Sequence, residues 1–304
     1  MRRKSKQLIA PKQAINHARI TIFGLVNLAN MRCVLLLFFL FILTHLDAQS
    51  GIHHLSDARS QAMAGSTVMN EGIFSLYGNT AGLSQITSLQ GIAVMESPFA
   101  LSELQGAGFG LASPLGSSTL GLKAATFGFD AYRELQFSLA YSRPLNSQLS
   151  LGAEMIYWNQ NISEYGNKGF LTFALGLQAN LSPTLQAGAY LYNPIRARVS
   201  EREPTFSSLQ IGLVYQASED LDLVAEVYKD IDFPAQFKAG VDYQIEDTFS
   251  LRLGVGTAPT RLSFGLGIKI LPDWAIDIAA SRHEFLGFSP SFSLRYTGIE
   301  KSIK

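Results

Sequence analysis

The sequence has 304 residues, of which 47% are hydrophobic and 16% charged, with 24 basic and 24 acidic side chains. Soluble domains usually carry about a quarter of charged residues, so this composition argues against an ordinary soluble protein. The balance of charge gives no support to nucleic-acid binding, which favours a basic patch. No run of about twenty apolar residues occurs, so the sequence predicts no membrane-spanning helix.

Residues 1–48 are expected to be a leader that ends in a signal peptide. The apolar run 34–43 follows a basic residue and ends shortly before the small residue Ala48, which is the pattern of a secretory signal. Cleavage is expected after Ala48. Residues 1–30 are interpreted either as an overextended start, with Met31 as the initiator, or as a long basic leader.

Removal of this leader on export would make the net charge of the mature chain negative. The leader holds seven Lys or Arg residues and one acidic residue, which leaves 17 basic and 23 acidic residues and a net charge of about −6. It also holds the single cysteine, Cys33. Disulfides and thiolate catalysis are therefore not expected in the mature protein. An exported β-protein without cysteine fits a bacterial outer membrane.

The next segment, residues 49–88, shows no alternation of apolar and polar residues. Small residues and turn formers dominate the stretches 56–66 and 77–83. We interpret it as a compact, irregular segment.

From residue 89 onward the chain alternates apolar residues with polar or small ones. Leu135, Phe137, Leu139 and Tyr141 share one parity, and polar or small residues occupy the other. A period of two indicates strands with one apolar and one polar face. Because the polar parity also carries isolated charges and glycines, the pattern is typical of a transmembrane barrel with its apolar face toward lipid.

The predicted fold is thus all-β: a transmembrane antiparallel barrel of about 14 strands over residues 89–297, with a periplasmic tail at 298–304. The strands are expected at 89–97, 105–113, 117–128, 133–142, 147–158, 168–180, 183–193, 206–216, 220–229, 235–244, 248–257, 260–270, 273–282 and 287–297. Connections after even strands are tight, and those after odd strands are expected to be longer, as at 159–168 and 283–289. Short turns face the periplasm in outer-membrane barrels, and the strand count is even, so the start of the first strand and the end of the last strand are both expected on the periplasmic side.

Two stretches carry a family resemblance: residues 57–65, and the run 77–83, which reads Tyr-Gly-Asn-Thr-Ala-Gly-Leu. They resemble the start of the long-chain fatty-acid transporter superfamily of outer-membrane barrels. In that superfamily the N-terminal segment plugs the lumen as a hatch. The resemblance implies that residues 49–88 form a lumen hatch with Arg59, Gly65, Asn79, Ala81 and Gly82 as its motif residues. Thr80 stands where members usually have Pro.

Later stretches, such as 193–194, 251–254 and 263–267, resemble an uncharacterised group in the Bacteroidota branch. That branch includes the type IX secretion barrels (PorV- and PorQ-like). The resemblance implies two alternative functions. One is a passive conduit for a small solute, with hydrophobic molecules among the candidates, and the other is an accessory or scaffold barrel for protein secretion at the cell surface.

The polar parity carries charges of both signs, which are expected to face the lumen: Glu154, Asp222, Glu226, Lys238, Asp242, Arg252, Lys269, Asp277 and Arg295. They could line an aqueous path, or they could form ion pairs that brace the wall and hold the hatch. Interspersed signs favour bracing, because a selective pore more often shows one sign. Diagonal Asp242–Arg252 and Lys269–Asp277 contacts are predicted across two hairpins. Asn79 and Gly82 are expected at a tight turn, with Gly82 at positive φ and close to the wall.

No constellation points to catalysis or to a cofactor. His53 and His54 are adjacent, which is more typical of a solvated terminus than of a metal site. No nucleophile-elbow motif (Gly-x-Ser-x-Gly) occurs. We therefore expect no enzyme, metal or cofactor, and name outer-membrane lipid, a hydrophobic solute or secretion components as the expected partners.

Overall fold

The computed structural model describes residues 55–200 and 203–298. The expected leader, the two histidines at 53 and 54, the first residues of the predicted hatch and most of the expected tail lie outside the described residues.

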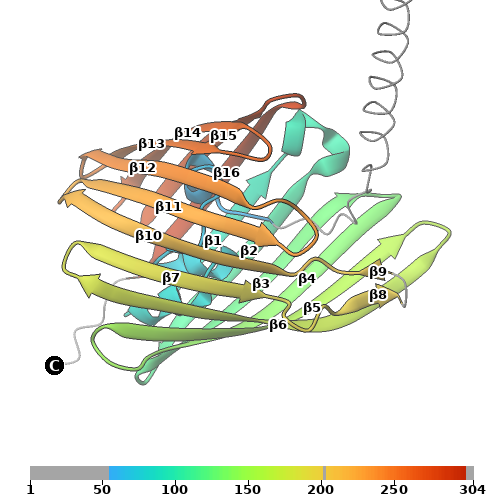
Figure 1. The fold of residues 1–304 in the computed structure, drawn as a ribbon, viewed down its shortest axis with the longest axis horizontal. Helices are drawn as coiled ribbons and strands as arrows, with labels where there is room; N and C mark the ends of the chain where they lie inside the picture. The colour runs from blue at the N-terminus through green and yellow to red at the C-terminus, as the bar shows by residue number, and fades with distance from the viewer. Residues whose placement is uncertain (1–54, 201–202, 299–304) are drawn as a thin grey trace, which may run out of the picture. The chain divides into compact units, whose positions relative to one another are not determined.

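Fourteen antiparallel strands of the described chain close into a barrel (Figure 1). The barrel strands are β1 (Gln90–Glu96), β2 (Gly106–Leu115), β3 (Ser118–Phe129), β4 (Tyr132–Pro144), β5 (Leu149–Ile162), β6 (Gly166–Ser182), β7 (Leu185–Tyr192), β10 (Ser208–Ser218), β11 (Leu221–Asp230), β12 (Gln236–Glu246), β13 (Phe249–Gly256), β14 (Arg261–Leu271), β15 (Trp274–His283) and β16 (Gly287–Thr297). Each predicted strand is present. Strands β1 and β16 pair from Gln90 opposite Thr297 to Glu96 opposite Ser291, so the sheet has no open edge.

The connections alternate in length less strictly than the sequence predicts. All the expected tight turns lie at one end of the barrel, which we call the tight-turn end. At the opposite end, the loop end, β5 and β6 extend beyond their predicted limits. The long loop expected at 159–168 is therefore wrong, and residues 163–165 join the two strands directly. The longer loop expected at 283–289 is wrong as well, because only residues 284–286 separate β15 from β16. The connection between β7 and β10 is longer and contains a small hairpin, β8 (Arg198–Ser200) and β9 (Glu203–Pro204).

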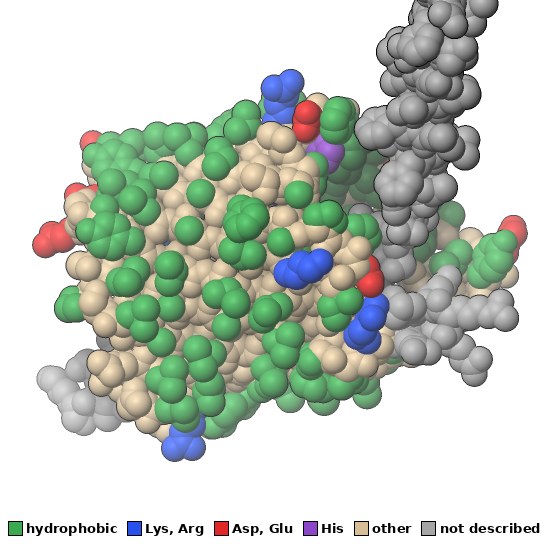
Figure 2. Space-filling model, viewed as in Figure 1, with side chains coloured by type: hydrophobic (Ala, Val, Ile, Leu, Met, Phe, Trp, Pro, Cys, Tyr) green, Lys and Arg blue, Asp and Glu red, His purple; other side chains and the backbone are tan. Residues whose placement is uncertain are grey.

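The outer face of the barrel is apolar. Large side chains on the predicted lipid-facing parity are exposed around the wall, including Phe137, Leu139 and Phe264. Figure 2 shows hydrophobic side chains spread over the wall, with most charged side chains of this view toward the strand ends. Trp274 and Tyr296 pack together near the tight-turn end, with ring centroids 5.0 Å apart. An apolar band bordered by aromatic residues is the surface of a transmembrane barrel.

This outer face gives a depth-dependent prediction. The change Leu139→Arg places a charge in the middle of β4 on the lipid side, and we expect it to lower the free energy of unfolding by about 2–4 kcal/mol. Leu145→Arg, at the tight turn that follows β4, should cost about 0–1 kcal/mol. Urea unfolding in lipid vesicles measures both values. Equal costs at the two positions would contradict a membrane-buried face at Leu139.

The described part of the hatch segment, residues 55–88, is irregular and packs on the inner faces of the strands. It forms a short α-helix, α2 (Ala58–Ala62), and two 3-10 helices, η1 (Gly72–Tyr77) and η2 (Thr80–Gln85). Two further 3-10 turns, η3 (Pro98–Ala100) and η4 (Ser102–Leu104), lie in the loop after β1. No helix in the described ranges has the length and apolar content needed to cross a membrane.

The core lies between this segment and the wall. Side chains of the hatch segment and of β1 form one buried apolar cluster, which contains Leu76, Leu83 and Ile92. A second cluster joins Val68 of the hatch segment to Trp158, Tyr190 and Tyr192 of the wall. The inward faces of the strands are thus covered by protein.

Candidate functional site

The first anchor of the hatch segment is helix α2. The side chain of Asp57 caps the helix by accepting a hydrogen bond from the Ser60 backbone N–H at 2.9 Å. The Ala58 backbone N–H donates to the hydroxyl of Ser293 on β16 at 2.8 Å. Strand β14 comes so close that a Cβ added to Gly265 would lie 2.6 Å from the Cβ of Ala62. The helix therefore lies directly against the wall.

The second anchor is the amide of Asn79, at the start of η2. Its Nδ2 donates to the carbonyls of Val68, Leu177 and Ala189, at 2.9, 3.0 and 3.2 Å. Leu177 and Ala189 belong to the wall strands β6 and β7, so one side chain joins the hatch segment to the barrel. A Cβ on Gly176 would lie 2.0 Å from Asn79 Oδ1, which requires glycine there.

Charged side chains of the wall also hold the backbone of the hatch segment. Glu226 Oε2 accepts hydrogen bonds from the N–H groups of Thr67 and Val68 at 2.8 and 2.9 Å. Lys238 Nζ lies 2.8 Å from Glu226 Oε1 and donates to the Gly65 carbonyl at 2.7 Å. Gly65 has a φ of +73°, a conformation in which glycine is favoured. This buried pair serves as a clamp on the hatch segment.

A second group of charges forms a chain of ion pairs along the inner face of the wall, from the hatch segment over β12 and β13 to β15. Arg59 Nε of the hatch segment lies 2.9 Å from Asp242 Oδ2, and Arg252 Nε lies 2.9 Å from Asp242 Oδ1. Arg252 Nη1 reaches Asp277 Oδ1 at 2.6 Å. The last contact joins β13 to β15 and passes over Gly267 of β14, where an added Cβ would lie 2.8 Å from the guanidinium. Small residues on the middle strand thus make room for the pair.

A further ion pair inside the barrel was not predicted from the sequence. Lys123 of β3, absent from the predicted lumen charges, lies 2.9 Å from Glu154 of β5 and donates to the Leu76 carbonyl of the hatch segment at 2.8 Å. Its place on the polar parity of β3 was the signal that could have identified it. Six of the nine predicted lumen charges are therefore paired within the wall or bonded to the hatch segment, as the bracing hypothesis expects: Glu154, Glu226, Lys238, Asp242, Arg252 and Asp277.

Two expectations about these charges need correction. The predicted Lys269–Asp277 contact is wrong: Lys269 is exposed near the tight-turn end, and Asp277 is occupied by Arg252. Asp242 and Arg252 are in contact as predicted, but they lie directly opposite each other and not diagonally. The two-residue turn at 247–248 and a bulge beside it set this register.

The motif residues of the hatch segment also depart from expectation in one detail. Asn79 and Gly82 form a tight turn, with the Gly82 N–H donating to the Asn79 carbonyl at 3.1 Å. Gly82 is not at positive φ, however, and its close neighbour is the Asn70 carbonyl of the same segment, 2.0 Å from an added Cβ. Ala81 is fully buried beside it and donates to Asn79 Oδ1. The glycine is needed for packing inside the hatch segment.

Arg295 and Asp222, the remaining predicted lumen charges, also point inward. The guanidinium of Arg295 lies over the Phe74 ring, 4.8 Å from its centroid. Asp222 is half-buried and lies opposite Asp242 on the neighbouring strand. Both side chains therefore face the hatch segment.

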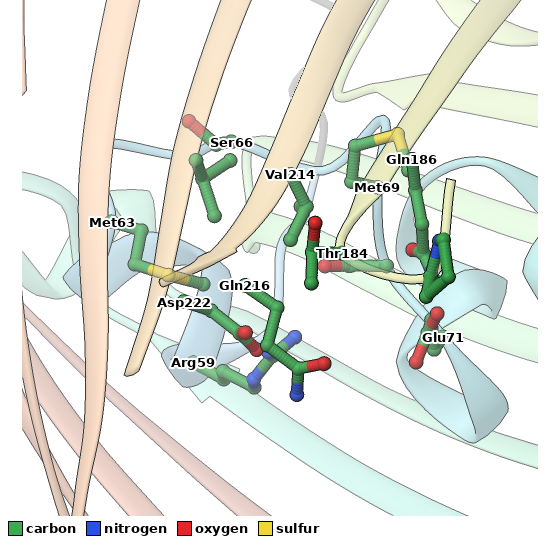
Figure 3. A pocket seen from close by; sticks show the side chains of 13 residues that line it. Arg59, Met63, Ser66, Met69, Glu71, Thr184, Gln186, Val214, Gln216 and Asp222 are labelled. Atoms are coloured by element: carbon green, nitrogen blue, oxygen red, sulfur yellow. The ribbon is translucent and has the colours of Figure 1, made fainter. Parts of the chain in front are cut away.

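A small polar cavity of about 110 Å³ lies between the hatch segment and the wall at the tight-turn end. Figure 3 shows Arg59 and Asp222 pointing into the same space beside Gln216, with Met69 and Glu71 on the far side. Pro183 and Thr184 of the β6–β7 turn and Gln186 of β7 also line it. At this end the hatch segment and the wall leave room between them.

The geometry defines a class of protein, a closed transmembrane barrel with an internal N-terminal segment. No model of a known protein family matches the chain, and no curated protein sequence matches it. Solved structures do. CymD, a monoaromatic hydrocarbon channel, superposes with a TM-score of 0.64 at 14% identity, over 83% of this chain and 99% of CymD.

Two further barrels give the same result. The toluene transporter TbuX of Ralstonia pickettii has a TM-score of 0.59 at 12% identity, over 81% of this chain and 99% of its own. A FadL homologue of Pseudomonas aeruginosa has a TM-score of 0.57 at 12% identity, over 80% and 98%. The chain therefore shares the fold of these barrels.

Proposed function

We propose that the protein is an outer-membrane barrel that conducts a small hydrophobic solute passively. The fold is shared with barrels whose names state that they carry monoaromatic hydrocarbons or toluene. The observation that carries the proposal is the lumen: residues 55–88 line it with buried apolar clusters and are anchored at several points. A lumen that is filled with apolar side chains favours the passage of a hydrophobic solute over the passage of ions.

The tight-turn end is proposed to face the periplasm, as in other outer-membrane barrels. The solute would enter at the loop end and leave past the hatch segment. The cavity at the tight-turn end is smaller than the roughly 300–1,000 Å³ of typical ligand sites. The solute can therefore pass only if the hatch segment moves away from the wall during transport.

The alternative function, an accessory barrel for type IX-like secretion, has only the sequence resemblance behind it. Two of the compared barrels, CymD and TbuX, are named as a hydrocarbon channel and a toluene transporter. The proposal includes no catalytic step and no cofactor. Co-purification with secretion components would be the observation in favour of the alternative.

The test is uptake by intact cells that lack their own hydrocarbon channel. Cells that express the chain should take up labelled toluene faster than cells with an empty vector, while uptake of a labelled disaccharide stays unchanged. Faster uptake of both solutes would indicate an open aqueous pore, and unchanged uptake of both would contradict a conduit. Fractionation with the outer membrane is the necessary control.

A further inference from the structure

The outer wall carries a hollow that the conduit proposal does not use. It has a volume of about 550 Å³ and lies on the lipid side of β4, β5, β6, β7 and the first residues of β10, and it reaches the tight-turn end on β4 and β5. Exposed leucines and two outward-facing alanines, Ala153 and Ala189, line it. Ala153 lies opposite Leu175, and Ala189 lies opposite Leu177. Small side chains between large ones form a groove deep enough to hold a hydrocarbon chain.

At the bottom of this groove, only the backbone of the wall strands separates the lipid side from the hatch segment. Gly152 and Gly176, which also line the groove, have no side chain on the lumen side, and the hatch segment packs against them there. A Cβ on Gly152 would lie 2.3 Å from the Ala81 N atom. The groove therefore lies directly behind the second anchor of the hatch segment, at a place where the wall is rigidly backed.

A cation stands at one end of the groove. Arg143 is the penultimate residue of β4, exposed on the lipid-facing parity and opposite Leu151. It makes no ion pair with any residue in the described ranges 55–200 and 203–298. Guanidinium groups bind phosphate oxygens in a bidentate manner. An exposed arginine at the end of an apolar groove matches the two halves of a phospholipid.

Two other hollows of the wall lack this combination. The hollow of about 620 Å³ below the loop 97–105 includes Arg133, which is paired with Asp130 at 3.1 Å. The hollow of about 490 Å³ beside Phe109 includes Lys123, which is buried and paired with Glu154. The Arg143 groove is thus distinguished by a cation that is available to a ligand.

We propose that this groove is a binding site for one glycerophospholipid, with an acyl chain over Ala153 and Ala189 and the phosphate against Arg143. The phosphate then lies at the tight-turn end of β4, where Arg143 is located. The inference does not rest on the proposed solute conduit, because it uses only the outer face of the wall.

Native mass spectrometry of the delipidated protein in mild detergent tests the site. The probes are a dipalmitoyl phosphatidylglycerol and the dipalmitoylglycerol that lacks its phosphate. The wild-type chain should retain one phosphatidylglycerol and bind the diacylglycerol about tenfold more weakly. Equal binding of the two probes would overturn the proposal without any variant.

Three variants separate the two halves of the site. Arg143→Gln should weaken phosphatidylglycerol binding about tenfold and leave diacylglycerol binding unchanged. Ala153→Leu with Ala189→Leu fills the groove and should abolish retention of both lipids. Ala225→Leu with Ala239→Leu, an outward-facing pair on β11 and β12, is the matched control and should bind like wild type. Undiminished binding in the filled variant, or equal losses in the control pair, would overturn the site.

Discussion

Deleting residues 56–84 is expected to convert a barrel that carries no steady ion current into an open aqueous pore. These residues supply the side chains that fill the lumen, among them Val68, Leu76 and Leu83, which have no exposed surface. The wall closes without them, because β1 pairs with both β2 and β16. The expected reading in planar bilayers is a steady conductance that the full chain lacks.

Two controls make this result interpretable. The deleted form must still migrate differently on gels before and after heating, which shows that the barrel has formed. Removal of the outer hairpin 198–204, at the loop end, should leave the conductance at background. If the 56–84 deletion folds and conducts no more than the full chain, the hatch segment is not what closes the lumen.

The second large effect is expected at Arg252. This guanidinium makes ion pairs with both Asp242 and Asp277, and all three side chains are largely buried. In Arg252→Ala, Asp242 keeps Arg59, whereas Asp277 loses the ion pair that the structure gives it. A buried carboxylate without its partner is costly, so we expect a loss of about 3–5 kcal/mol in the free energy of unfolding.

A double-mutant cycle separates the pair from general damage. Arg252→Ala combined with Asp277→Ala should be more stable than Arg252→Ala alone, because the unpaired charge is removed with its partner. Urea unfolding in vesicles gives the four values of the cycle. Additive losses would show that the two residues do not interact, and would favour the hypothesis of an aqueous path lined by these charges.

The barrel was predictable because it follows from local rules. Strand parity, tight turns and the count of alternating runs each depend on neighbouring residues, as along Leu135 to Tyr141. The division of charges between lumen and lipid followed from the same parity. Glu226 and Lys238, for example, both face inward, directly opposite each other.

The contacts inside the lumen could not be predicted in the same way. The Arg252–Asp277 pair joins strands that are not neighbours, and it depends on Gly267 between them. The register at Asp242 depends on a bulge next to the turn, and one added residue changes which side chains lie opposite. Residues 55–88 show no regular alternation of apolar and polar residues, so their packing could not be predicted from the sequence pattern. Asn79 was identified through the family resemblance. The three backbone carbonyls that accept hydrogen bonds from its side chain could be identified only in the structure.

The most direct test of a conduit past the hatch segment is to lock that segment to the wall. The hydroxyls of Ser84 and Ser150 lie 2.9 Å apart, so cysteines at both positions, in a Cys33→Ser background, place two sulfurs near bonding distance. In proteoliposomes the account predicts that oxidation slows uptake of the labelled hydrocarbon and that a reductant restores it, with either single cysteine variant unaffected. Equal uptake by the locked and the reduced forms would contradict it.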